Sequence, residues 1–339
     1  MTSRGSSSLR GSLLAGAVGD ALGGSIEFDR IDRIRGRFGP SGLTDYAPAY
    51  GRLGAITDDT QMTLFTLEGL VLARRRGSDP VHEVRVAYGR WLRTQGGPVV
   101  PSDGWLLDVP ELHQARAPGN TCLTALRSGV FGTVESPIND SKGCGAVMRA
   151  APVALWSDDP REVFALATAT GALTHGHPSG YLSAGVLAVL VQQLLAGAEL
   201  TGAIEVAHGE LQRWPGNEEQ LVLLDLALEM ATRGVRPTPE VIETTLGGGW
   251  VGEEALAIAV LTALAAESLA DGLLLAVNHS GDSDSTGALC GNLLGARDGV
   301  AAIPEHWLTE LELADVVERL AAEAAEVFGR SPGDDPGRA

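Results

Sequence analysis

The spacing of apolar residues constrains the fold of this chain most strongly. Apolar positions recur with the period of an α-helix along most of the sequence, and strand-like alternation is scarce. The clearest helical stretches cover residues 160–170, 180–198, 218–233, 253–270 and 310–328. Between them lie loops rich in Gly, Pro, Asn and Asp, which are residues that end helices and form turns. We therefore predict an all-α protein whose functional residues lie in loops at helix ends.

Length and composition favour one domain. The chain has 339 residues, of which 44% are hydrophobic, mostly Ala, Leu and Val, and 5% are aromatic. That length allows one large domain or two ordinary ones, and no repeat or composition break divides the sequence. We predict a compact single domain over residues 9–328, a flexible N-terminus at 1–8 and a disordered tail at 329–339.

Charge and cysteine content disfavour several partners and compartments. The net charge is −18, from 43 acidic and 25 basic residues, so binding of nucleic acid by a basic face is not favoured. The longest apolar stretches are shorter than a membrane-spanning helix, and Asp20 interrupts the apolar run near the N-terminus, which argues against a signal peptide. The three cysteines lack CxxC spacing, which suits a reducing compartment. We expect a cytoplasmic monomer without membrane contact.

Two clusters of acids and hydroxyls stand far apart in the sequence, and an apolar run follows each. The first is TDDT at 57–60, and the second is GDSDST at 281–286. Each has an ordinary structural interpretation, since Thr57 is a good N-cap and the second cluster can form an Asx-type turn. The second also resembles part of a calcium loop, but Leu293 stands where an EF-hand needs a bidentate Glu.

Together the two clusters predict a metal site. They supply four carboxylates and several hydroxyls without any sulfur, and oxygen ligands suit hard cations such as Mg²⁺, Mn²⁺ or Ca²⁺. Four carboxylates would balance two divalent cations, so the clusters could clamp a two-metal site if both helix starts meet in the fold. The spacing in the sequence leaves open whether they meet.

Five further motifs accompany the two clusters: GSLLAGAVGDALGGSIEF at 11–28, GNTC at 119–122, NDSKGCGAVMRAAPVAL at 139–155, LTHGHPSGYL at 173–182 and GGGWVGEEALAIAV at 247–260. With these motifs in the same order, the chain is similar to the ADP-ribosylglycohydrolase family. The similarity extends from about residue 9 to 328. It implies an all-helical fold, two bound Mg²⁺ ions with Mn²⁺ as the alternative, and hydrolysis of the bond between ADP-ribose and a protein side chain.

The resemblance also implies roles for residues in both clusters. It assigns metal ligation to Thr57, Asp58, Asp59, Asp282, Asp284 and Ser285. Asp58 or Asp59 would also accept a proton from the attacking water, and Glu27 would be an acid that gates or assists the reaction. The serine at 285 resembles the arginine-directed branch, because other branches tend to have threonine there. Glu254 is a weaker candidate for a supporting acid, since Glu253 lies beside it.

The resemblance places ADP-ribose against glycine-rich loops. The candidate substrate-binding residues are Gly119, Asn120, Thr121, Ser141, Gly143, Cys144, Gly145 and His175. Backbone N–H groups in such loops can approach phosphate, although simple turns are the alternative interpretation. His175 could hydrogen-bond ADP-ribose or serve the fold, and an HxH zinc site with His177 lacks a third ligand nearby. Lys142 and Arg149 are candidate charge partners, and Arg149 could equally brace the fold.

We predict a Mg²⁺-dependent hydrolase that removes ADP-ribose from modified proteins, with ADP-ribosyl-arginine as the first choice of linkage. Its expected partners are an ADP-ribosylated protein and ADP-ribose. One alternative is the same fold acting on ADP-ribosyl-serine, a modified nucleic-acid base or O-acetyl-ADP-ribose, and another is a non-catalytic ADP-ribose-binding protein. The glycine-rich run 247–252 formally fits GxGxxG, but no βαβ series surrounds it, so we interpret it as a turn that opens a helix.

Overall fold

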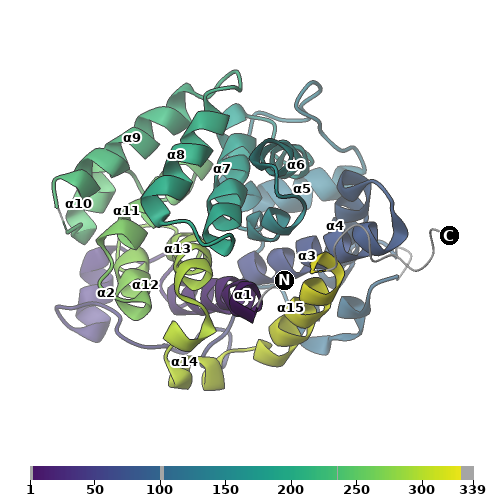
Figure 1. Ribbon diagram of the computed structural model, residues 1–339. Helices are drawn as coiled ribbons and strands as arrows, with labels where there is room; N and C mark the ends of the chain where they lie inside the picture. Colours follow the sequence, from purple (N-terminus) through teal and green to yellow (C-terminus); the bar gives the residue numbers. More distant parts are fainter. Residues whose placement is uncertain (1–2, 100–102, 235, 330–339) are drawn as a thin grey trace.

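The computed structural model describes residues 3–99, 103–234 and 236–329, and these residues form a helical fold with no named strand (Figure 1). The all-α prediction is therefore confirmed. The α-helices are α1 (Ser3–Gly23), α2 (Ile31–Phe38), α3 (Asp58–Arg76), α4 (Pro80–Thr94), α5 (Asn120–Ser128), α6 (Pro160–Ala172), α7 (Pro178–Leu195), α8 (Leu200–Leu211), α9 (Glu218–Thr232), α10 (Pro239–Thr245), α11 (Gly252–Ala265), α12 (Leu269–Val277), α13 (Ser283–Asp298), α14 (Glu305–Glu310) and α15 (Ala314–Phe328). Short 3-10 turns at η1 (Trp105–Asp108), η2 (Pro110–His113), η3 (Cys144–Ala146), η4 (Ala151–Leu155) and η5 (Val300–Ala302) join them.

Local sequence signals define several helix ends. The Thr57 hydroxyl accepts a hydrogen bond from the backbone N–H of Asp59, so Thr57 is the N-cap of α3, as the sequence indicated. Asp79 and Asp159 cap α4 and α6 in the same way, and each is followed by a proline in the first turn. α3 ends at Gly77, whose left-handed φ of 63° suits glycine.

α1 and α13 pack backbone against backbone through facing glycines. A Cβ added to Gly19 would lie 2.0 Å from the carbonyl oxygen of Gly287, and one added to Gly291 would lie 2.0 Å from that of Ala15. Only glycine allows so close an approach. The two helices lie side by side in Figure 1, although they come from opposite ends of the chain. This packing fixes the start of α13, and with it the second acid cluster, against α1.

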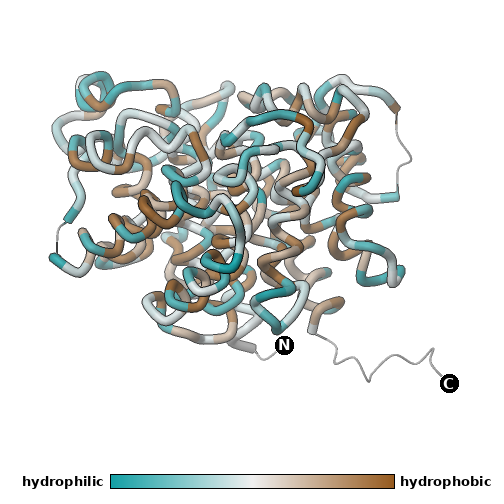
Figure 2. Tube along the Cα trace, turned by 90° about the horizontal axis from the view of Figure 1, so that it is seen from above, coloured by the Kyte–Doolittle hydropathy of each residue, from teal (hydrophilic) through white to brown (hydrophobic). Residues whose placement is uncertain are grey.

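One hydrophobic core holds the fold together. It contains buried residues from Leu9 in α1 to Ala324 in α15, and a smaller cluster lies between α9, α10 and α11. Hydrophobic stretches run along the central helices in Figure 2. α7 has the length and composition of a membrane-spanning helix, but 83% of its 18 residues are buried inside the fold. A helix that is apolar on all sides and buried to this extent forms the centre of the hydrophobic core.

The ends of the chain differ in part from the expectation. α1 begins at Ser3, so residues 3–8, which we expected to be flexible, are helical. The start of this helix is held by packing of Ser7 close to Gly299 and by an ion pair between Arg10 and Glu318 at 2.6 Å. These contacts join residues far apart in the sequence, which local patterns do not reveal. Apart from residue 329, the predicted tail at 329–339 lies outside the described residues.

Candidate metal centre and substrate cavity

The two acid clusters meet at one cavity of about 190 Å³. Asp58 and Asp59 enter it from the first turn of α3, and Asp282, Asp284 and Ser285 enter it from the start of α13. The other predicted site residues that line the cavity are Glu27, Gly119, Asn120, Thr121, Gly143, Cys144, Gly145 and His175. The structure therefore answers the question that sequence spacing left open.

Thr57 and Ser141 are the predicted site residues that do not line this cavity, but both support it. Thr57 is fully buried behind the first cluster, where its hydroxyl caps α3. Ser141 lies with its hydroxyl 3.0 Å from that of Thr121, so it joins the two glycine-rich loops. Each hydroxyl thus positions a neighbour that lines the cavity.

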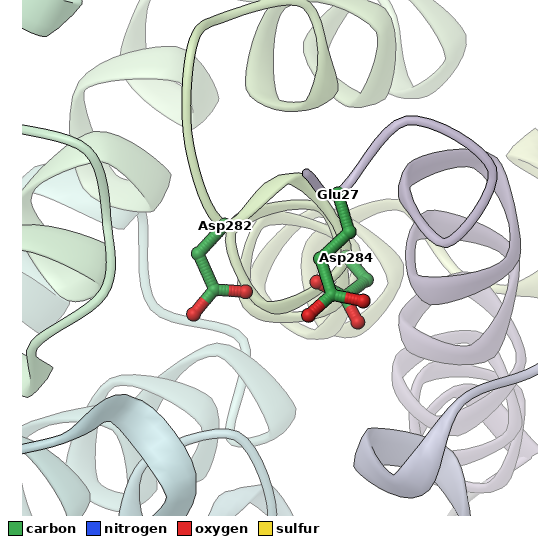
Figure 3. Close-up of side chains that lie close together, drawn as sticks. All are labelled: Glu27, Asp282 and Asp284. Atoms are coloured by element: carbon green, nitrogen blue, oxygen red, sulfur yellow. The ribbon is translucent and has the colours of Figure 1, made fainter. Parts of the chain in front are cut away.

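Three carboxylates converge at the acidic side of the cavity. Glu27, Asp282 and Asp284 each offer an oxygen within 4.8 Å of the others, and all three side chains are buried (Figure 3). Glu27 Oε2, Asp59 Oδ2 and Asp284 Oδ1 have no hydrogen-bond partner among the described residues. Buried carboxylate oxygens without partners are costly, and a divalent cation would supply the missing interaction. An oxygen-only donor set with unpartnered oxygens fits a hard metal ion.

Burial and mutual repulsion raise the pKa of the clustered acids. Burial, and then the charge of Asp284, raises the pKa of Glu27 to about 10. The same two causes raise the pKa of Asp58, Asp59 and Asp282 well above the ordinary value. A bound cation would reverse the repulsion, because an opposite charge favours the ionised form of each carboxylate.

Asp20 is a buried acid that supports the cavity and was not predicted from the sequence. Its carboxylate is fully buried and accepts hydrogen bonds from the backbone N–H groups of Thr57 at 3.0 Å and Thr60 at 3.1 Å. The Thr60 hydroxyl also donates to it. Asp20 thus anchors the start of α3 to α1 and directs the first acid cluster toward the cavity. An acid within the apolar stripe of GAVGDALGG was the available signal.

The glycine-rich loops form another wall of the cavity. The backbone N–H of Gly119 donates to Asp58 Oδ2 at 3.2 Å, and α5 begins at the next residue. Gly143 forms an isolated bridge with Val251, which brings the 141–145 loop against the turn before α11. Cys144 Sγ lies 2.7 Å from Asp282 Oδ2, so this loop also contacts the second acid cluster.

Other candidates have structural partners. Lys142 forms ion pairs with Glu219, at 2.8 Å, and with Glu253, and it does not line the cavity. Glu254 Oε2 accepts the backbone N–H groups of Gly248 and Gly249, at 3.1 and 3.0 Å. Glu254 therefore braces the glycine-rich turn that opens α11, as we interpreted that motif. His177 caps α7 by accepting the backbone N–H of Ser179 at 3.1 Å.

An aromatic pair at the cavity was not found from the sequence. Trp250 lines the cavity and stacks on Phe28, with ring centroids 5.8 Å apart and planes 19° from parallel. Both rings are exposed, Phe28 at 73% and Trp250 at 44%. Exposed stacked aromatics beside a cavity can receive a flat group from a ligand. The sequence signal for this pair is weak: aromatic residues make up only 5% of the chain, so each one is a candidate for a special role.

Known proteins are similar to this chain in sequence and in fold. ADP-ribosyl-[dinitrogen reductase] glycohydrolase of Rhodospirillum rubrum is 28% identical over 307 residues, covering 89% of this chain and 90% of that protein. ADP-ribosylarginine hydrolase Tri1 of Serratia proteamaculans is 26% identical over 335 residues, covering 96% of this chain and 80% of that protein. A solved structure described as an ADP-ribosylglycohydrolase-related protein complex matches with a TM-score of 0.69 at 26% identity, covering 97% of this chain and 100% of that one.

The family similarity covers almost the whole sequence. The sequence model of the family described as ADP-ribosylglycohydrolase matches residues 1–333, and so includes both acid clusters, Glu27 and the glycine-rich loops. The solved structure shows that the likeness extends to the helical fold. The chain therefore belongs to the ADP-ribosylglycohydrolase family.

Proposed function

We propose that this protein is a metal-dependent hydrolase that removes ADP-ribose from modified proteins, with ADP-ribosyl-arginine as its preferred linkage. The observation that carries the proposal is the meeting of both acid clusters and Glu27 with the glycine-rich loops at one cavity. The names of the relatives from Rhodospirillum rubrum and Serratia proteamaculans support the activity, and the second supports arginine as acceptor.

The donor set supports Mg²⁺ as the metal, bound as two ions. Asp58, Asp59, Asp282, Asp284 and Ser285 line the cavity and would hold the metal, and the buried hydroxyl of Thr57, next to Asp58 in the chain, is the further ligand that we propose. All six residues offer oxygen. When bound, Mg²⁺ would supply Lewis acidity toward water and the ribose hydroxyls. Mn²⁺ is the expected substitute, because it accepts the same ligand type.

The residues of the chain account for proton transfer and for binding. Water attacks the anomeric carbon of the ribose, and a carbon–oxygen bond forms as the carbon–nitrogen bond to arginine breaks. Asp58 or Asp59 accepts one proton of the water, and the carboxyl group then passes this proton to the guanidine nitrogen as it departs. The Gly119 N–H holds one oxygen of Asp58, which orients that carboxylate at the cavity. We assign Glu27 an assisting role, since it lies beside Asp282 and Asp284.

The choice of linkage is tested by comparing acceptors. Release of free ADP-ribose is measured from the same carrier protein modified on arginine or on serine, with Mg²⁺ present and with Asp58→Asn as the inactive control. We expect faster release from arginine and a loss of several orders of magnitude in the variant. Faster release from serine would keep the activity and overturn the arginine assignment. Binding of ADP-ribose without release from either would favour a non-catalytic ADP-ribose-binding protein.

A further inference from the structure

Arg149 is a buried cation whose contacts lead to the cavity wall. Its side chain is 1% exposed, its guanidinium carbon lies 4.3 Å from the centre of the Tyr88 ring, and Nη1 lies 3.3 Å from Cys122 Sγ. Cys122 lines the cavity. Among the described residues, the fully buried ion pairs are Arg90–Glu68 and Arg116–Glu312, and Arg149 has no carboxylate partner. A buried charge without a counter-charge destabilises the folded protein. A role of Arg149 at the cavity would explain why the fold keeps this charge.

The hydrogen bonds of Arg149 determine the protonation of His175. Arg149 Nη2 donates to Thr174 Oγ1 at 2.6 Å, and Thr174 Oγ1 lies 2.8 Å from His175 Nδ1. A guanidinium can only donate, so the hydroxyl accepts in the first bond. The described residues offer the hydroxyl hydrogen no acceptor other than Nδ1. Nδ1 is therefore unprotonated, and a neutral His175 carries its proton on Nε2.

The ring is neutral and its Nε2 faces the cavity. Burial, and then the charge of Arg149, lowers the pKa of His175 to about 3. His175 lines the cavity, and no hydrogen bond within the described part of the chain uses its Nε2. A Cβ added to Gly143 or Gly145 would lie 3.5 or 3.2 Å from this nitrogen, so the two glycines leave room beside it. A ligand atom can therefore approach the Nε2–H.

We propose that Arg149 and Thr174 hold His175 as its Nε2–H tautomer, and that this N–H donates to an oxygen of ADP-ribose. The inference rests on the proposed function for the identity of the ligand. Arg149 and Thr174 are positioning residues, because they act through His175. The arrangement also places a positive charge behind the glycine-lined wall, which favours an anionic ligand in a chain whose net charge is −18.

The tautomer is tested directly by nitrogen NMR of protein labelled on histidine. In the wild-type protein, Nε2 of His175 should carry a proton and Nδ1 should not. Thr174→Val removes the hydroxyl at nearly constant volume, and the ring should then sample both tautomers. Thr174→Ser restores the hydroxyl and should restore the single tautomer, which a general packing defect would not do. A proton on Nδ1 in the unchanged protein would overturn the proposal.

The hydrogen bond from His175 to the ligand is tested by measuring ADP-ribose binding with isothermal titration calorimetry. The side-chain NH₂ of glutamine can take the place of Nε2 as a donor, whereas that of asparagine can take only the place of Nδ1. His175→Gln should therefore bind ADP-ribose about tenfold more tightly than His175→Asn, a difference that corresponds to one hydrogen bond. Thr174→Val should weaken binding several-fold, and Thr174→Ser should not. Equal binding by the two His175 variants, or unchanged binding by Thr174→Val, would overturn the proposal.

These experiments distinguish a failure of the proposal for His175 from a failure of the proposed function. Neither NMR nor ADP-ribose binding requires turnover, so binding without hydrolysis would contradict the proposed function and leave the role of His175 standing. Binding of ADP by the same variants shows which part of the ligand accepts the hydrogen bond. Weakening for both ligands places the acceptor on the diphosphate or the adenosine, and weakening for ADP-ribose alone places it on the distal ribose. An unchanged protein that binds no ADP-ribose would overturn both proposals.

Discussion

The carboxylate of Asp20 accepts a hydrogen bond of 3.0 Å from the backbone N–H of Thr57, the N-cap of α3. Asp20 lies on α1, and α1 packs backbone against backbone on α13. One buried carboxylate therefore connects the start of α3 to the helix that fixes the start of α13. This connection explains how acid clusters far apart in the sequence come to share a cavity.

Replacing Asp20 with alanine should destabilise the protein and impair activity. Asp20→Ala leaves two backbone N–H groups and the Thr60 hydroxyl without their acceptor. The expected loss is about 2–4 kcal/mol of unfolding free energy, because several buried donors lose their shared acceptor. Asp32→Ala removes an exposed acid on α2 and should change stability by less than about 0.5 kcal/mol. Similar urea midpoints for the two variants would contradict the anchoring role.

The contact between α1 and α13 should be intolerant of a single methyl group. In Gly291→Ala the added Cβ would lie 2.0 Å from the carbonyl oxygen of Ala15, so the helices must separate. Gly202→Ala is the matched control, because a Cβ there meets no atom within 4 Å. We expect a loss of about 2 kcal/mol or more for Gly291→Ala and a gain of about 0.4–1 kcal/mol for Gly202→Ala. Urea unfolding compares them, and equal effects would contradict the close packing.

The contribution of a buried neutral histidine to stability should fall in acid. Burial lowers the pKa of His279 to about 4, whereas an unfolded histidine has a pKa of about 6.5. Between those values the unfolded chain binds a proton that the native ring does not, so the contribution of His279 to the unfolding free energy decreases as pH falls. His279→Gln should reduce that slope by about 1 kcal/mol per pH unit between pH 6 and 4.5. The exposed His82→Gln should leave it unchanged, and equal slopes for the two variants would refute the assignment.

Removing one carboxylate from the acid cluster should have opposite effects with and without metal. Asp284 raises the pKa of its acidic neighbours by repulsion, so Asp284→Asn should raise the thermal midpoint in EDTA at pH 8. With Mg²⁺ the unchanged protein gains stability from binding, and the variant should gain less. Asp32→Asn, on the exposed face of α2, controls for net charge. A lower midpoint for Asp284→Asn in EDTA would contradict repulsion as the dominant effect.

The sequence predicted the helical class and most residues at the cavity. Apolar periodicity is a local property, so it revealed the helices, and TDDT marked the start of α3 for the same reason. The resemblance to a family then identified Glu27, the glycine-rich loops and His175, which do line the cavity. Their roles in metal binding and catalysis remain predictions that the variants above test.

Long-range contacts account for what the sequence did not reveal. The clusters meet because glycines of α1 and α13 face each other and Asp20 reaches α3, and neither relationship has a local signature. Lys142 looked available to an anionic ligand, but it pairs with Glu219 on α9. The stacking of Phe28 on Trp250 likewise joins loops that lie far apart in the sequence.

The central claim is that both acid clusters form one metal-dependent site. Its most direct test is release of ADP-ribose from an arginine-ADP-ribosylated protein by EDTA-treated protein, with and without added Mg²⁺. We predict release only with Mg²⁺, and a loss of several orders of magnitude in both Asp58→Asn and Asp282→Asn, one from each cluster. Release that persists in EDTA, or that survives the loss of either aspartate, would contradict a shared metal site.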